Sequence, residues 1–301
     1  MTEIVPSCPL CGSQDAVLFD QRPFRGHHVS NQICKACGLV YQSPRMTEAE
    51  RQAFYEDEYR LLYQGQASPS LKDLNVQSAR AESTLIFIQP WVMKLSNILD
   101  IGCSTGIMLQ NFKARFQAQA TGVEPGLLYR EYAQGLDLDV FSSLEDLPPS
   151  DPNPFDLISM MHVLEHLPEP VAYLQGLREK LLHPKGWLLL EVPNLYAHDC
   201  FEVAHLVSFS PHTLEQVVAK AGFRITRCRL HGMPRSKLIP LYITLLAQPD
   251  ADITYSLIPD HRVRLKRQIG FLRRRLVTRL FPGQAWFPVR DNNQESLGAH
   301  A

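Results

Sequence analysis

The sequence lacks a long apolar run. No stretch approaches the ~18 consecutive apolar residues of a transmembrane helix. Its first residues, MTEIVPSCPLCGS, have neither the basic start nor the apolar core of a signal peptide, so we expect a cytoplasmic protein. The 301 residues are 45% hydrophobic and 20% charged, a balance that supports a folded core and argues against wholesale disorder. The length predicts about two structural units.

The sequence has no excess of positive charge outside one late segment. Residues 261–280 hold eight Lys and Arg and no acid, so a chain of net charge −1 carries −9 elsewhere. A nucleic-acid-binding domain spreads positive charge over a whole face. We therefore do not expect a nucleic-acid partner, although a local contact with a polyanion stays open.

The same segment predicts a helix. Over 262–280, large apolar residues recur at three- and four-residue steps: Leu265, Ile269, Leu272, Leu276 and Leu280. Such a helix could lie on an anionic membrane surface, near a lipid-linked substrate. Alternatively, it packs its leucine stripe on the domain and leaves its arginines in solvent. We expect this second arrangement, since terminal helices commonly dock, and we expect a loose tail after it.

The remaining chain divides into three parts. Residues 1–45 predict short strands and turns, and residues 46–90 a helical linker in which Thr47 and Glu50 form a capping box. In 91–250 strands alternate with helices, which predicts an α/β, doubly wound, seven-stranded, mostly parallel sheet. Too few residues separate the last two strands for a helical crossover, so we expect these strands to be antiparallel. The fourth part, 251–301, holds the basic helix and the tail.

Four of the seven cysteines lie in the first 37 residues. Cys8 and Cys11 form one Cys-x2-Cys pair, Cys34 and Cys37 a second, with 22 residues between the pairs. Two such turns direct four thiolates at one centre, which predicts a structural Zn²⁺ site with no open position for catalysis. A redox pair and four packed core cysteines are the alternatives. A disulfide framework is not expected without an export signal.

A glycine-containing turn follows the first strand of the alternating segment. The stretch 99–106, LDIGCSTG, leaves a strand and opens a helix, where a nucleotide-like ligand lies across the ends of parallel strands. The dinucleotide fingerprint fails because positions 104 and 107 are Ser and Ile, and a P-loop fails because GK[ST] is missing. Glu124 closes the next strand, where a carboxylate can accept both ribose hydroxyls. Together, the turn and this acid predict a ligand site.

These residues, with three later motifs, resemble the class I S-adenosylmethionine-dependent methyltransferases over about residues 80–248. The resemblance is carried by LDIGCSTG, VEPG, SLEDLP, FDLISMMHVLEHLPEP and GWLLLEVPN. It implies a Rossmann-like sheet of seven strands with the last two antiparallel, in agreement with the strand pattern.

The resemblance also implies roles for single residues. Asp100 and the loop from Gly102 through Cys103 to Gly106 would cradle the methionine part of S-adenosylmethionine. Ser104 stands where many members have glycine, and it is small enough to keep the turn.

Four further residues would complete that cofactor site, together with Glu124 on the ribose. Asp146 and the backbone of Leu147 would face the adenine amino group. Met161 and His162 would line the cofactor from the other side.

A cysteine-rich lobe before such a domain resembles the sugar C-methyltransferases that act on nucleotide-linked deoxysugars, and their relatives in polysaccharide clusters. Those enzymes carry a His-Glu-His stretch before a Tyr-Phe-Ser, and the later His is the proposed base. Here residues 201–210 read FEVAHLVSFS, so His205 falls on the later His while Ala204 replaces the Glu. This replacement puts carbon-acid chemistry in question.

Three histidines qualify as a general base, which assists transfer to a hydroxyl or a carbon acid. His205 is either this base or a packed loop histidine. We interpret His162 as a wall of the cofactor site and His166 as a structural residue that caps a helix. Tyr59 and Tyr63 would reach the substrate or form an apolar seam between the lobes, and we expect the seam.

The favoured function is methyl transfer to a small molecule, namely a sugar, nucleotide sugar or glycan intermediate. A zinc-assisted RNA methyltransferase is the alternative, but the place of its Asn/Asp-Pro-Pro-aromatic motif reads MMHVLEH. A non-catalytic S-adenosylmethionine-binding or docking protein is a third hypothesis, and Glu124 with the glycine turn argues against it.

Overall fold

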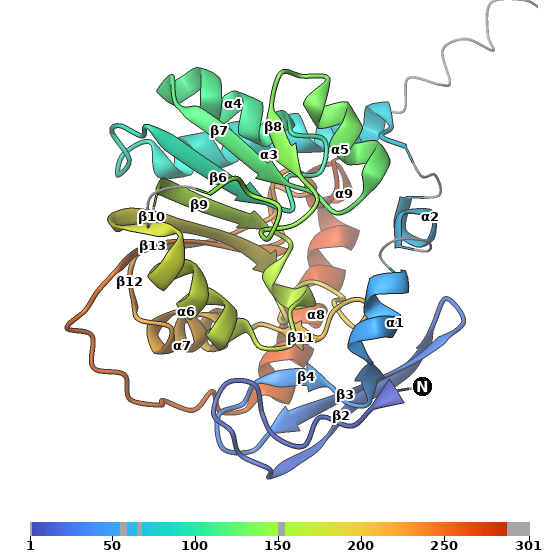
Figure 1. Cartoon of the computed structure of the whole chain (residues 1–301). Helices are drawn as coiled ribbons and strands as arrows, with labels where there is room; N and C mark the ends of the chain where they lie inside the picture. The colour runs from blue at the N-terminus through green and yellow to red at the C-terminus, as the bar shows by residue number, and fades with distance from the viewer. Residues whose placement is uncertain (1, 55–58, 65–67, 150–153, 288–301) are drawn as a thin grey trace, which may run out of the picture.

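A computed structural model describes residues 2–54, 59–64, 68–149 and 154–287, and its main layer is a seven-stranded sheet (Figure 1). The strand order is β12-β13-β10-β9-β6-β7-β8. Strands β8, β7, β6, β9 and β10 are parallel, whereas β13 is antiparallel to β10 and β12. The strands are β6 (Asn97–Ile101), β7 (Gln119–Val123), β8 (Asp139–Phe141), β9 (Phe155–Met161), β10 (Leu182–Pro193), β12 (Phe223–His231) and β13 (Tyr242–Pro249). The predicted doubly wound sheet is confirmed.

Helices cover both faces of this sheet (Figure 1). Alternate residues of β6 serve the two cores, since Ile98 packs with the α3–α5 side and Leu99 with the α6–α7 side. The elements are α3 (Leu71–Ile88), α4 (Ile107–Phe116), α5 (Leu127–Gln134), the 3-10 helix η2 (Leu164–His166), α6 (Pro170–Lys180) and α7 (Pro211–Lys220). The ends of the parallel strands therefore open between two helical layers.

The N-terminal lobe is a second, smaller sheet that is completed from a distant part of the chain. Its order is β11-β4-β3-β2, and β1 pairs separately with β5. The strands are β1 (Thr2–Glu3), β2 (Ala16–Phe24), β3 (His27–Cys34), β4 (Val40–Gln42), β5 (Arg45–Met46) and β11 (Val207–Ser208). Because Val207 pairs with Tyr41, the loop after β10 is hydrogen-bonded to this lobe.

The linker between the lobes begins as predicted. Thr47 and Glu50 form the capping box of α1 (Glu48–Ala53), and α2 (Tyr59–Gln64) follows. The expected continuation through 55–58, and part of the linker at 65–67, lie outside the described residues. Tyr59 and Tyr63 pack against a cluster that includes Phe54 and Val203, so the predicted apolar seam is present.

The C-terminal helix α8 (Val263–Leu280) forms where predicted, but our expectation for its packing was wrong. The large apolar stripe faces solvent, and Leu272 is 58% exposed. Arg267 and Arg274 instead point at the protein and donate to backbone carbonyls. Guanidinium groups can pack on rings and bond carbonyls at once, which lets the arginine face be the docked face.

The chain after α8 is also more ordered than expected. A short helix, α9 (Pro282–Ala285), places Ala285 in a fully buried position beside Tyr242. Residues 288–301 of the expected loose tail lie outside the described part. Within the described residues, no helix is long and apolar enough to cross a membrane.

Candidate functional site

The turn after β6 requires glycine at two positions. Gly102 and Gly106 both have φ of +73°, and a Cβ on Gly102 would lie 2.5 Å from a methyl carbon of Val163. Ser104 also adopts a left-handed conformation, with φ of +53°, so serine keeps the turn as expected. The turn brings the main chain close to the end of β9, and a ligand can approach the backbone there.

Glu124 directs its carboxylate at this turn. One oxygen accepts the Ser104 amide at 3.0 Å and the other accepts the Gly126 amide at 2.9 Å, and the side chain is almost fully buried. The two features that predicted a ligand site therefore meet at one point, where β6 and β7 end side by side.

Asp100 and Cys103 lie further inside the protein than the exposed part of the turn. Burial raises the pKa of Asp100 to about 7, although its carboxylate accepts the Ser159 hydroxyl at 2.7 Å. The Cys103 thiol packs against Gly122 in the core, and its amide donates to the Val123 carbonyl. Asp100 therefore sits beneath the turn, and Cys103 shapes the turn from the core side.

Asp146 and Leu147 lie in the turn after β8. Glu124 donates its amide to the Phe141 carbonyl, which places that turn beside the acid. Asp146 is exposed, and hydrogen bonds from Ser142 and then Ser143 lower its pKa. The structure thus groups Asp146 and Leu147 on the Glu124 side of the turn after β6.

Met161 and His162 lie at the end of β9, on the side of the glycine turn opposite Glu124. Met161 is buried in the core, and His162 has a φ of +58° with its amide donated to the Glu191 carbonyl. The His162 ring meets Tyr242 edge-on, with 5.1 Å between centroids. Burial and Arg80 oppose protonation, but two carboxylates outweigh them and raise the pKa of His162.

Sequence reasoning missed the ion pair that holds His162. Arg80 of α3 donates to Glu191 of β10 at 3.0 Å, and both side chains are buried. Glu191 also accepts the Thr244 hydroxyl at 2.8 Å and lies 3.3 Å from the His162 Nε2 atom. Despite burial, His162, His231 and Arg80 hold the pKa of Glu191 well below its usual range. The signal was one acid inside the apolar strand GWLLLEVPN.

A second buried cluster joins η2 to the loop after β10. One ligand-type atom from each of Glu165, His166 and His205 lies within 4.8 Å of the others. The His205 Nδ1 atom is 2.9 Å from the Cys200 carbonyl, and the His166 Nδ1 atom is 2.9 Å from the Ala204 carbonyl. Because a carbonyl only accepts, each Nδ1 carries the hydrogen and each neutral ring keeps its lone pair on Nε2. His166 thus bonds a distant loop instead of capping a helix.

Burial decides the charge of these rings. It lowers the pKa of His205, and it lowers the pKa of His166 to about 4. In Glu165, the neighbouring His162 and other histidines outweigh burial and bring the pKa to about 2. At neutral pH, His205 and His166 are therefore neutral and Glu165 is ionised.

A carboxylate near His205 comes from an unexpected position. An oxygen of Glu202 lies 3.9 Å from the His205 Nε2 atom, and burial raises the pKa of Glu202. Glu202, three residues before His205, therefore places a carboxylate near its ring, whereas position 204 is alanine.

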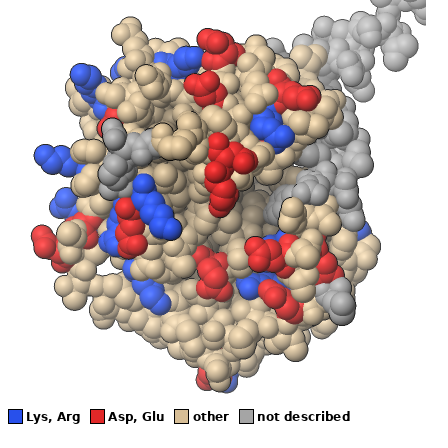
Figure 2. All heavy atoms as spheres, in the orientation of Figure 1, with Lys and Arg blue, Asp and Glu red and all other residues tan. Residues whose placement is uncertain are grey.

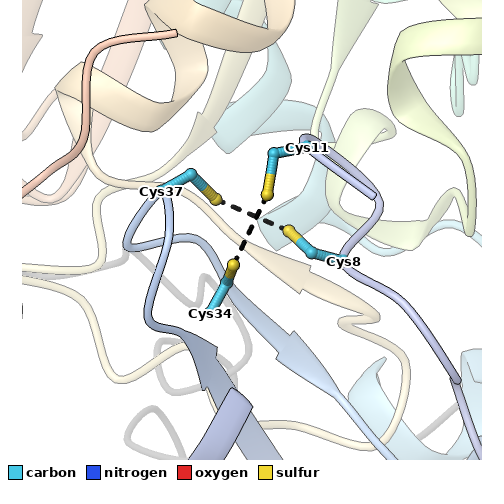
Figure 3. A group of neighbouring side chains, drawn as sticks. All are labelled: Cys8, Cys11, Cys34 and Cys37. Carbon is cyan, nitrogen blue, oxygen red and sulfur yellow. Dashed lines mark hydrogen bonds between the residues drawn. The ribbon is translucent and has the colours of Figure 1, made fainter. Parts of the chain in front are cut away.

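The four N-terminal cysteines converge as predicted (Figure 3). The sulfurs of Cys8 and Cys37 are 3.5 Å apart, as are those of Cys11 and Cys34, and all four lie within 4.8 Å of one another. Zn–S bonds of about 2.3 Å in a tetrahedron place sulfurs roughly 3.8 Å apart, so this donor set fits zinc. None of the seven cysteines is in a disulfide in this structure.

Comparisons with known proteins bear on the sheet and its glycine turn. A family described as a methyltransferase domain matches residues 55–227. The ubiquinone biosynthesis O-methyltransferase of Xanthomonas campestris pv. campestris is 34% identical over 106 residues, which are 33% of this chain and 44% of that protein. The enzyme of that name from Neisseria meningitidis is 27% identical over 151 residues, 45% of this chain and 63% of that one. The match spans less than two thirds of both relatives.

Among solved structures, the similarity extends over more of the chain. The 1,6-didemethyltoxoflavin-N1-methyltransferase of Burkholderia thailandensis, crystallised with S-adenosylhomocysteine, has a TM-score of 0.54 and 15% identity. The alignment covers 77% of this chain and 100% of that one. At this identity the similarity describes the fold.

Proposed function

Because the chain belongs to the methyltransferase-domain family and is an S-adenosylmethionine-dependent methyltransferase, we propose that it methylates a hydroxyl of a sugar-type small molecule, with His205 as the general base. The observation that carries this proposal is the neutral, buried imidazole of His205 beside Glu202. A hydroxyl must lose its proton during transfer, and a histidine that is neutral at physiological pH can accept it.

The position of His205 relative to the cofactor turn supports this role. Val163 contacts Gly102, and two residues later the Glu165 carbonyl accepts the amide of Leu206. His205 therefore lies beside the chain that leaves the end of β9. An acceptor held there would lie between the base and the glycine turn at the end of β6.

The cofactor would be held by the residues around the turn. Glu124 would exchange its bonds to Ser104 and Gly126 for the ribose, and Asp146 would face the adenine. The remaining contacts would come from Asp100, Gly102, Cys103, Gly106, Leu147, Met161 and His162. When bound, S-adenosylmethionine supplies a methyl group on a sulfonium, which is already activated, so alignment of the acceptor carries much of the rate.

Polar side chains surround the place where the methyl-accepting substrate would lie. His166 and His205 face each other there, Glu202 lies beside them, and Tyr59 meets His166 edge-on. A site that offers both hydrogen-bond donors and hydrogen-bond acceptors suits a substrate with several hydroxyls. Figure 2 shows acidic side chains on both sides of the central hollow, a charge that disfavours a polyanion such as RNA. The names of the curated relatives, O-methyltransferases, also favour an oxygen acceptor.

We further propose that Cys8, Cys11, Cys34 and Cys37 bind one structural Zn²⁺. Four thiolates leave no coordination position for a substrate. The ion would fix the lobe that pairs with β11, two residues after His205. The ion would thus contribute to catalysis only indirectly, because it would fix the position of the loop that carries His205.

The test is incubation of the full chain with labelled S-adenosylmethionine and a panel of nucleotide sugars, with mass spectrometry of the products. A methyl ether on a sugar supports the proposal. Transfer only to RNA, or to carbon or nitrogen, contradicts it. Binding of S-adenosylhomocysteine by calorimetry without transfer to any acceptor class would favour the non-catalytic hypothesis.

A further inference from the structure

The exposed face of α8 is a continuous apolar stripe. Its members are between 48% and 65% exposed: Leu265, Ile269, Leu272, Leu276 and Leu280. Phe281 extends the stripe at the end of the helix and is 51% exposed. A stripe of this length on an outer helix marks an interaction surface, because scattered apolar residues would not align along one face.

The opposite face of α8 is fixed to the protein by arginines. Arg264 donates to the carbonyls of Leu18 and Phe19 in β2, and Arg267 donates to the carbonyls of Leu195 and His198. The guanidinium of Arg267 also lies over the Phe201 ring. These contacts set the rotation of the helix, so the apolar stripe cannot turn inward without breaking them.

Arginines border the stripe on both sides. Arg275 and Arg279 lie on one side and Arg273 on the other, by the 100° step of the helix. All three are exposed, and within the described residues no ion pair or hydrogen bond involves them. Segment 261–280 has no acid to neutralise them.

This charge pattern selects the partner. Two copies of α8 that met through their stripes would set arginine rows against each other, a like-charge arrangement that opposes pairing. An apolar stripe between cationic rows instead matches a bilayer with anionic headgroups, where leucines enter the acyl boundary and arginines stay with the phosphates.

We propose that α8 binds the surface of an anionic lipid bilayer through Leu265, Ile269, Leu272, Leu276 and Leu280, with Arg273, Arg275 and Arg279 at the headgroups. The contact is peripheral, since the helix lies in the plane of the surface. The arginines beneath the helix hold the 195–198 carbonyls, so docking would place the loop leading to His205 close to the lipid. Only this last consequence rests on the proposed function.

The test is co-sedimentation of the full chain with phosphatidylcholine vesicles that contain or lack phosphatidylglycerol. We expect binding only to the anionic vesicles, and weaker binding as salt rises. Leu272→Gln combined with Leu276→Gln should weaken binding about tenfold or more. Each of Arg275→Gln and Arg279→Gln should weaken it about fivefold.

A matched control keeps the result specific. Ile86→Gln combined with Met93→Gln removes two exposed apolar residues far from α8 in the sequence and should leave binding unchanged. Affinity for S-adenosylhomocysteine should be equal in all variants, which separates this proposal from the proposed function. Three results would overturn the proposal. The first is no binding to anionic vesicles at low salt, and the second is an equal loss of vesicle binding in the control variant. The third is a dimer in solution that dissociates in the variant with Leu272→Gln and Leu276→Gln.

Discussion

The imidazole rings of His166 and His205 meet edge to face, with 5.0 Å between their centroids. Each ring bonds a backbone carbonyl through Nδ1, and burial lowers the pKa of both. Burial, together with the charge of a protonated His205 in the case of His166, therefore favours the neutral form of both rings.

This pairing predicts the pH profile. As the pH falls, His205 takes up a proton and stops acting as a base. Because its pKa is lowered, kcat/KM should stay on its plateau down to the usual histidine range of about 6.5 and fall only below it. A profile of kcat/KM from pH 4 to 9 measures this limb. An acid limb that begins well above pH 7 would mean that another group is the base.

Removal of the base gives a direct measurement. His205→Gln should lower kcat by about 10²- to 10⁴-fold, the usual contribution of general base catalysis. Affinity for S-adenosylhomocysteine, measured by calorimetry, should not change. His183→Gln, at an exposed site in β10, is the control and should retain full activity. Equal turnover in the His205 variant and the control would remove His205 from the mechanism.

The proposed role of Glu124 leads to a prediction about cofactor affinity. In Glu124→Gln the side chain keeps its shape but loses the negative charge of the carboxylate proposed to accept two ribose hydroxyls, so affinity for S-adenosylhomocysteine should fall about tenfold or more. Glu131→Gln, at an exposed site in α5, should leave affinity unchanged. Unchanged affinity in the Glu124 variant would place the ribose elsewhere.

The buried pair of Arg80 and Glu191 predicts a stability effect. Arg80→Met leaves the Glu191 charge buried with one partner fewer, and should cost about 3–5 kcal/mol of unfolding free energy. Arg80→Met combined with Glu191→Gln should recover part of that loss, because the uncompensated charge is gone. Urea unfolding of both variants checks this, and a double variant less stable than the single one would contradict it.

The metal proposal predicts stoichiometry. Elemental analysis should find one zinc per chain, and Cys34→Ser should lose the zinc and lower the melting temperature. Cys228→Ser, far from the cluster in the sequence, is the control and should keep the metal. A second tightly bound equivalent would indicate that Glu165, His166 and His205 hold a metal ion, which would rule out His205 as a free base.

Local patterns predicted most of the fold but not its long-range contacts. The capping box at Thr47, the alternating strands and the glycine turn are set by neighbouring residues, and the structure has them. The pairing of Arg80 with Glu191 joins α3 to β10 across 111 positions, and no local pattern contains it. For α8, periodicity revealed the apolar stripe but not which face docks, because that depends on carbonyls and rings elsewhere in the chain.

For the candidate site, single motifs placed Glu124 beside the turn at Ser104 correctly. The proximity of Glu202 to His205 was not predicted, because the fold of the 200–206 loop, and not the order of its residues, sets the distance between the two side chains.

Strand β11 has a consequence for synthesis. The cysteine lobe is translated before the seven-stranded sheet, yet the fourth strand of its own sheet, Val207–Ser208, follows β4 (Val40–Gln42) only after five strands of the larger sheet. Until then, β4 presents an open edge that can pair with another nascent chain. The cysteine lobe thus acquires the last strand of its own sheet only after most of the larger sheet has been made.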